Sequence, residues 1–329
     1  MRPSASTKSK DDTLNIIIMK SKPNISVVIN VKNEAENLNK CLKSIVGFAD
    51  EIIVVDMKSS DDSVAVAKKY NSRVFSYHPM KFVEPARNYA LSKAKGKWVL
   101  LLDPDEYLSK TLKKELKKIT LRSDVDFVKI PRQNFIFGKW IRHANCWPDY
   151  LIRFFKKGSV TWQNEIHSQP ATKGNSLTLL DSEKLAIKHN NYQNVSQFLL
   201  RALRYSSIQA DELKAKDYKI KVTDFILKPI QEFNSRFFFA EGYKDGIHGL
   251  IFCLLQQFAI LLVYIKLWEK QGSTDKQLTY ESYISASQEA NFEYDHWFTK
   301  FFKEEYSPNI FKVFLIKLRH WFNYLTKNF

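Results

Sequence analysis

The sequence predicts an α/β fold, in which a mostly parallel sheet is flanked by helices and followed by a helical C-terminal extension. Three observations predict it. Apolar, β-branched runs alternate with helical patterns over the first third of the chain. Polar or acidic residues follow several of these runs directly. After Lys188 the spacing of apolar residues becomes helical throughout. Strand–helix alternation gives a parallel sheet that is covered on both faces.

The individual elements follow from local patterns. Strands are predicted by short apolar runs rich in Val and Ile, at residues 25–31, 51–56, 73–77, 98–102 and 126–130. Helices are predicted by apolar residues three and four positions apart, at residues 33–46, 61–70, 85–95, 108–119, 195–216, 220–239 and 246–268. The segment 131–170 is dense in Trp, Arg, His and Asn and receives no assignment beyond a loop-rich region.

Three parts of the chain are expected. Residues 1–22 are rich in Ser and Lys around a short apolar patch, which is too short for a signal sequence, and we expect a disordered tail. Residues 23–188 form the predicted α/β domain. Residues 189–329 form the predicted helical region.

The composition points to an anionic partner without choosing one. The chain has 329 residues and a net charge of +16, which suits a nucleic acid, an acidic membrane face or phosphorylated substrates. The three cysteines show no metal-binding spacing, and a reducing cytoplasm fits them. A non-catalytic nucleic-acid-binding protein is the alternative of another class. The basic residues are spread along helices and form no known nucleic-acid-binding motif, so we expect no nucleic-acid partner.

An acidic pair ends the strand at residues 98–102. Asp103 and Asp105 follow it one residue apart, and on a strand such residues point to the same side. Carboxylate oxygens suit Mg²⁺ or Mn²⁺ carried by a diphosphate. A solvated turn is the alternative. Asn33-Glu34 and Asp56 also follow predicted strand ends, where ligands bind in sheets of this class.

Four ordered motifs carry a resemblance to a known family. The runs ISVVINVKNEAENLNKCLKSI, DEIIVVDMKSSDDSVAVAKKY and EPARNYALSKAKGKWVLLLDPDE, followed by WPDYLIR, resemble the family 2 glycosyltransferases with a GT-A fold. Within the family the chain is similar to the branch of lipopolysaccharide-core glucosyltransferases, including the later segment GYKDGIHGL. The resemblance implies a GT-A sheet and an enzyme that uses a nucleotide-sugar donor.

The resemblance implies a donor site at the strand ends. Glu34 and Asp56 match acidic residues that border the nucleotide base and ribose, and Asn33 stands beside Glu34. Arg87, in the ARN motif, matches a basic residue of the donor pocket. Glu34 could instead be only a charge at a helix N-terminus, and Arg87 could pair with a surface carboxylate.

The acidic pair matches the DxD motif of the family. Asp103 is then expected near the ribose and Asp105 on the metal that bridges the diphosphate. His167, in the segment EIH, stands where several relatives place a histidine near the metal. Ser168 follows it, where many members carry Glu, so no acidic role is expected there. A packed polar residue is the alternative for His167.

Asp149 occupies the place where such enzymes carry the general base, and Arg153 completes the matching PDxxxR pattern as a donor-binding residue. An acceptor hydroxyl is a poor nucleophile, and a carboxylate in hydrogen-bond reach can take its proton. The resemblance therefore implies single displacement with inversion. A turn cap after Pro148 is the alternative for Asp149.

The helical region suggests a membrane partner. Residues 246–268 could be a core, an interfacial or a spanning helix, and the polar residues among them disfavour spanning. Residues 309–329 contain no acidic residue and resemble a basic amphipathic anchor, with an ordinary terminal helix as the alternative. We expect a cytoplasmic enzyme, peripheral on the inner face of the membrane, with a glycan or glycolipid acceptor. A soluble acceptor is the alternative.

Overall fold

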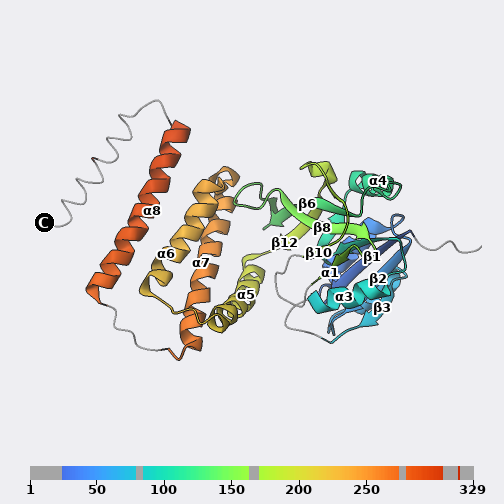
Figure 1. The fold of residues 1–329 in the computed structure, drawn as a ribbon, viewed down its shortest axis with the longest axis horizontal. Helices are drawn as coiled ribbons and strands as arrows, with labels where there is room; N and C mark the ends of the chain where they lie inside the picture. Colours follow the sequence, from blue (N-terminus) through green and yellow to red (C-terminus); the bar gives the residue numbers. More distant parts are fainter. Residues whose placement is uncertain (1–23, 79–83, 163–169, 274–278, 307–317, 319–329) are drawn as a thin grey trace, which may run out of the picture.

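The computed structural model describes residues 24–78, 84–162, 170–273, 279–306 and residue 318. In these residues a ten-stranded mixed sheet forms one part of the molecule, and long helices form the other (Figure 1). The main strand order is β3-β2-β1-β4-β8-β6-β12-β5, and β11 and β7 pair with β6 outside this path. The predicted fold class is confirmed.

The first half of the sheet is parallel. Its strands are β1 (Ile25–Val31), β2 (Glu51–Asp56), β3 (Arg73–Ser76) and β4 (Trp98–Leu102). The helices between them are α1 (Ala35–Ile45), α2 (Ser63–Lys69) and α3 (Glu84–Lys93). This half follows the strand–helix alternation that the sequence predicts.

The second half is mixed, because β8 runs antiparallel to both β4 and β6. Its elements are β5 (Glu106–Leu108), α4 (Lys110–Ile119), β6 (Phe127–Ile136), β7 (Lys139–Trp140), β8 (Asp149–Lys156), β11 (Ser176–Thr178), η1 (Glu183–Leu185) and β12 (Ile187–Tyr192). A separate small sheet pairs β9 (Val160–Thr161) with β10 (Ala171–Thr172).

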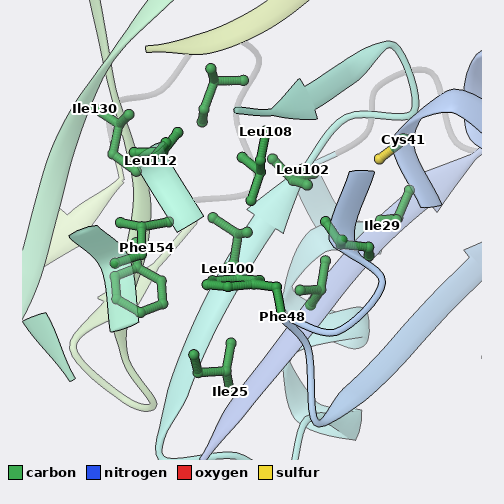
Figure 2. Packing of buried hydrophobic residues seen from close by; sticks show 14 of the residues in the cluster. Ile25, Ile29, Cys41, Phe48, Leu100, Leu102, Leu108, Leu112, Ile130 and Phe154 are labelled. Carbon is green, nitrogen blue, oxygen red and sulfur yellow. The ribbon is translucent and has the colours of Figure 1, made fainter. Parts of the chain in front are cut away.

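Alternate side chains of the central strands fill two hydrophobic cores. Leu100 and Leu102 of β4 lie in the core that α1 and α4 cover, together with Ile29 and Phe154 (Figure 2). Leu101 lies in the other core, which contains residues of α3. Successive side chains of a strand point to opposite faces, so this division shows that the sheet is covered on both faces. Because both faces of these strands are buried, their sequences are unbroken apolar runs.

Four helices stand in a row beside the sheet, in the order α8, α6, α7, α5 (Figure 1). They are α5 (Val195–Ala215), α6 (Val222–Asn234), α7 (Ile247–Lys270) and α8 (Tyr280–Tyr306). A π-helical turn, η2 (Ser235–Phe239), and a 3-10 turn, η3 (Gly242–Asp245), join α6 to α7. In a single row each helix is covered only by its neighbours in the row, so apolar residues of α7 stay exposed.

The structure departs from the sequence prediction in the helical region and in the second half of the sheet. The long predicted helix at 220–239 is α6 followed by the π-turn. β6 runs past its predicted end at residue 130, and no strand was predicted where β5 and β7 to β12 lie. β12 continues the sheet past the boundary predicted at Lys188. The helix α8 was not predicted. Residues 1–22, His167 and, apart from Leu318, residues 309–329 lie outside the described residues.

Candidate functional site

The carboxyl ends of β1, β2 and β4 meet at one edge of the sheet. In the parallel pairing, Val31 lies beside Asp56, and Ile29 lies beside Leu102. The polar residues that follow these strands are therefore neighbours in space. The sequence predicted this edge as the ligand-binding edge of the sheet.

Asn33 and Asp56 fix the loops at this edge. Asn33 adopts a left-handed backbone with φ 54°, and its Oδ1 accepts a hydrogen bond from the backbone N of Ser60 at 2.7 Å. Asp56 is buried, and its Oδ1 accepts a hydrogen bond from the backbone N of Ser59 at 3.1 Å. Asn tolerates this backbone better than most residues. The contacts of both side chains with a nucleotide stay predictions.

Glu34 lies near the acidic pair. Burial raises its pKa, and the charge of Asp105 acts in the same direction, while a hydrogen bond of 2.8 Å from Asn37 Nδ2 opposes both. The net shift of the pKa is upward. The contact of Glu34 with a nucleotide stays a prediction.

The acidic pair lies in a turn after the strand. β4 ends at Leu102, and the backbone O of Asp103 accepts a hydrogen bond from Glu106 N at 3.0 Å. Pro104 takes the second position, as is common in such turns. The same-side geometry of a strand therefore does not extend to the pair, and the two aspartates contact different partners.

A chain of ion pairs runs from Arg87 through Asp103 to Asp149. Arg87 Nη2 lies 3.1 Å from Asp103 Oδ1. Arg153 pairs with Asp103 and lies 2.9 Å from Glu106 Oε1. Arg132 then bridges Glu106 at 3.1 Å and Asp149 at 2.7 Å. We call this set, in which the sign of the charge alternates, the ion-pair chain: Arg87, Asp103, Arg153, Glu106, Arg132 and Asp149.

The ion-pair chain keeps Asp103 and Arg153 charged. Burial alone would raise the pKa of Asp103, but Arg153 and Arg87 hold it well below its usual range. Burial alone would lower the pKa of Arg153, but Asp103 and Glu106 raise it. A buried charge is tolerated only when it is paired in this way.

Asp149 has one oxygen held and one oxygen available. Its Oδ2 accepts hydrogen bonds from Arg132 Nε at 2.9 Å, from Arg132 Nη2 at 2.7 Å and from Asn134 Nδ2 at 3.0 Å. Among the described residues, no side chain or backbone group donates to Oδ1. Burial raises the pKa of Asp149, but Arg132 and Asn134 outweigh it and lower the pKa below its ordinary value. Asp149 is therefore ionised at neutral pH, as a base must be.

Replacing Arg132 should change the pH dependence of any reaction that uses Asp149 as a base. Arg132→Gln removes a charge that lowers the pKa of Asp149, so that pKa rises. We expect the acid limb of the kcat/KM profile to move to higher pH by roughly 1–3 units. Arg122→Gln, which breaks an exposed ion pair with Asp124, is the control. An unchanged acid limb in Arg132→Gln would contradict the role of Asp149.

Asp105 contacts two side chains that the sequence did not single out. Its Oδ2 lies 3.3 Å from His189 Nε2 and 3.3 Å from Arg201 Nη2. His189 Nδ1 lies 2.6 Å from Asn134 Oδ1. Because Asn134 Nδ2 donates to Asp149 and to the backbone O of Cys146, its Oδ1 must be an acceptor. His189 Nδ1 therefore carries a proton, and Nε2 faces Asp105.

The pair formed by Asp105 and His189 fits a divalent cation that a substrate brings. Metal-ligating histidines commonly donate their other ring N–H to a carbonyl oxygen, as His189 does to Asn134. In the part of the chain that the structure describes, no three His, Cys, Asp or Glu side chains gather as a complete metal site. Mg²⁺ is often held by one or two protein ligands plus phosphates and water. His167 lies outside the described residues, and its role stays a prediction.

The loop before Asp149 is held by the helical region. Asp245 of η3 is buried, and its Oδ2 accepts hydrogen bonds from the backbone N of Arg142 at 3.1 Å and of His143 at 2.8 Å. Arg236 donates to the backbone O of Ala144 at 3.0 Å. We call these contacts the loop clamp. Asp245 lies in the segment GYKDGIHGL, which the sequence singled out without a role.

Breaking the loop clamp should slow transfer without weakening donor binding. Asp245→Ala frees two backbone N–H groups and lets the loop that leads to Asp149 shift. Displacements of about 1 Å can cost roughly 10²-fold in rate, and we expect a loss of kcat on this scale. Asp224→Ala is the matched control, because Asp224 is equally buried and caps α6 by accepting from Lys221 N at 2.8 Å. Equal losses of kcat in both variants would show only loss of stability.

Sequence reasoning missed several residues of the site. Glu106 is fully buried beside the predicted pair, and its place in an acidic triplet was the available signal. Arg132 and Asn134 lie in a strand that was predicted to end at residue 130. His189 and Arg201 come from distant elements, and no local pattern marks them.

The fold and this edge of acidic residues agree with a comparison against known families. Residues 26–174 match the model of glycosyl transferase family 2, so this part of the chain belongs to that family. The matched stretch contains Asp103, Asp105 and Asp149. The protein is therefore a glycosyltransferase with a nucleotide-sugar donor, and the resemblance seen in the motifs is confirmed.

Two relatives extend the likeness beyond the matched stretch. The uncharacterized glycosyltransferase RC0292 of Rickettsia conorii is 27% identical over 259 residues, which cover 74% of this chain and 90% of that protein. The lipopolysaccharide core biosynthesis glycosyltransferase LpsC of Rhizobium meliloti is 23% identical over 256 residues, which cover 75% of this chain and 93% of that protein. Both alignments are longer than the family match, so they include part of the helical region.

A solved structure, S. aureus TarS 1–349, is similar over 77% of this chain and 93% of that protein. The two are 15% identical, and the TM-score is 0.40. A likeness at this level carries no information on the substrates of this chain.

Proposed function

We propose that the protein is a metal-dependent, inverting glycosyltransferase that moves a sugar from a nucleotide donor to a hydroxyl of a cell-envelope glycolipid. One observation carries the proposal. Asp149 is an ionised carboxylate with Oδ1 available, and Asn134 and His189 connect it by short contacts to Asp105. A base for the acceptor and a carboxylate for the donor therefore share one edge of the sheet.

The reaction on the acceptor side is a single displacement. Asp149 Oδ1 takes the proton of the acceptor hydroxyl. The oxygen of that hydroxyl bonds to the anomeric carbon of the donor sugar while the bond between this carbon and the diphosphate breaks. Attack opposite the leaving group inverts the anomeric centre. Arg132 and Asn134 orient the carboxylate by holding Oδ2. A general base of this kind contributes about 10²–10⁴-fold.

The donor side is proposed to lie at the strand ends. Asp105 and His189 would hold a divalent cation, Mg²⁺ or Mn²⁺, which supplies positive charge next to the departing diphosphate when bound. Arg201 adds a positive charge at the same carboxylate. The remaining donor-binding residues proposed are Asn33, Glu34, Asp56, Arg87, Asp103 and Arg153.

A donor-binding measurement tests the site. We expect one class among UDP-, GDP- and ADP-linked sugars to raise the melting temperature only when Mn²⁺ is present. Release of the free nucleotide in the absence of acceptor would follow the same choice. No shift with any donor, with or without metal, would overturn the proposed site.

The glycolipid acceptor is supported by two observations. LpsC is named for lipopolysaccharide core biosynthesis, and it is similar over three quarters of this chain. The helix α7 also exposes an apolar stripe at helical spacing, which includes Ile247 with 63% of its surface exposed. The stripe consists of Ile247, Ile251, Leu254, Phe258, Ile265 and Trp268.

We propose that the stripe lies on the cytoplasmic face of the membrane. By length and composition α7 is also long and apolar enough to cross a membrane, and most of its apolar residues are not buried inside the protein. An interfacial position is favoured because α7 packs against both α5 and α6 along the row, which leaves one apolar face exposed. The net charge of +16 favours a membrane of anionic lipid.

Vesicle binding tests the membrane proposal. The triple variant Ile251→Glu, Leu254→Glu and Phe258→Glu should lose at least tenfold in affinity for vesicles of phosphatidylglycerol. The variant replaces three apolar side chains by negative charges, which the negatively charged lipid repels. Leu121→Glu is the control, since Leu121 is 86% exposed on the sheet domain. Co-sedimentation of the triple variant at the level of Leu121→Glu would contradict the membrane face and favour a soluble acceptor.

A further inference from the structure

A cavity of about 230 Å³ lies between α5, α6 and α7. Apolar side chains line part of it, but its polar lining is unusual for the middle of a helical region. The polar side chains that line it are Tyr192, Tyr205, Ser206, Gln209, Glu232, Arg236 and Gln256.

The cavity shares walls with both halves of the catalytic site. Tyr192 lines it, and the guanidinium of Arg201 lies 5.3 Å from the Tyr192 ring while also contacting Asp105. On another wall, Arg236 belongs to the loop clamp, whose loop leads into Asp149. Tyr192 and Arg201 therefore stand between the cavity and Asp105, and Arg236 stands between the cavity and the loop that leads to Asp149.

The lining offers amide groups that the protein itself does not use. Among the described residues, neither Gln209 nor Gln256 makes a side-chain hydrogen bond, although both are half-buried. Glu232 pairs with Arg236 at 2.5 Å, which places a charged pair in the same wall. The two amides are accessible from the cavity and can pair with a polar ligand there.

We propose that this cavity is an acceptor subsite that binds one sugar unit of the acceptor near the hydroxyl that is glycosylated. The proposal rests on the proposed function. Amide and carboxylate groups suit sugar hydroxyls, and the rings of Tyr192 and Tyr205 suit the apolar faces of a sugar ring. Gln256, one of two adjacent glutamines in the apolar helix α7, then has a role in sugar recognition.

A lipid chain is the competing occupant. The lining also contains Phe198 and Ile260, which an acyl chain could contact. The ion pair and the two amides argue against it, because an apolar chain would leave their hydrogen-bonding capacity unmet. The exposed stripe on α7 consists of other residues and offers a separate surface for lipid.

Two adjacent glutamines make the test. Gln256 lines the cavity and Gln257 does not, although both are half-buried on the same helix. Saturation-transfer NMR would measure binding of methyl glycosides of glucose, galactose, mannose and heptose to the wild type, Gln256→Leu and Gln257→Leu. We expect at least one glycoside to bind the wild type and Gln257→Leu, and to bind Gln256→Leu roughly tenfold more weakly, as expected for a lost buried hydrogen bond.

Three further outcomes are decisive. Binding of no glycoside to the wild type, or equal binding to both variants, would overturn the subsite. Binding of decanoate that Gln256→Leu strengthens and Gln257→Leu leaves unchanged, without glycoside binding to the wild type, would assign the cavity to lipid. The thermal shift by nucleotide and Mn²⁺, measured on the same samples, separates the two proposals. Its absence in the wild type would overturn the donor site, while the glycoside result would still decide the cavity.

Discussion

Asp149→Asn should lower kcat for sugar transfer by about 10²–10⁴-fold, the range that a general base contributes. The amide has nearly the same shape as the carboxylate but cannot take a proton. Arg132 and Asn134 would still find a carbonyl oxygen in place of Oδ2, so the loop should keep its position. Donor binding, measured by the thermal shift with nucleotide and metal, should stay unchanged.

Asp126→Asn is the matched control for this variant. Asp126 is 26% exposed and pairs with Lys156 at 3.0 Å, while Asp149 is 27% exposed and pairs with Arg132 at 2.7 Å. Both changes remove one ion-paired carboxylate from the sheet domain. Normal turnover by Asp149→Asn would exclude Asp149 as the base.

Asp105→Asn should abolish the effect of metal on nucleotide binding and lower the transfer rate by at least roughly 10²–10³-fold, as for loss of one group that stabilises developing charge. The amide is a poor ligand for a hard cation and leaves Arg201 without its carboxylate. The measurement is the rate and the thermal shift over a titration of Mn²⁺. Full transfer by the variant in excess metal would refute the metal role.

His189→Ala tests whether His189 takes part in the proposed metal site. Even loss of a residue that only orients a metal ligand typically costs 10–100-fold in metal affinity or activity, so the Mn²⁺ dependence should move to at least roughly 10–100-fold higher concentration. Asp124→Asn, which breaks an exposed ion pair, should leave the Mn²⁺ dependence unchanged. If His189→Ala keeps the wild-type dependence, His189 neither binds the metal nor orients Asp105 for it.

The strands that the sequence predicts well are those buried on both faces. β1, β2 and β4 consist largely of Val, Ile and Leu because both of their faces meet apolar cores. The strands β8 and β12 were missed because some of their side chains face the site. Arg153 interrupts the apolar residues of β8, and His189 interrupts those of β12. Neither segment therefore shows the apolar pattern that predicts a buried strand.

The same reasoning explains which site residues were found. Asp103 and Asp105 follow an apolar strand directly, and a local pattern is enough to mark them. Arg201 contacts Asp105 across 96 positions of the chain, and such a contact exists only after the helices have packed beside the sheet. Arg87 and Arg153 were predicted as donor-binding residues, and the structure pairs both with Asp103, in an ion-pair chain that no spacing rule describes.

The loop clamp has a consequence for how such enzymes can be recombined. The peptide that delivers Asp149 is fastened from the helical side by Asp245 and Arg236. A chimaera that grafts the helices of another protein onto residues 1–193 would keep the sheet and lose these fastenings. We therefore expect the sheet domain and the helical region to keep their function only when they are exchanged together.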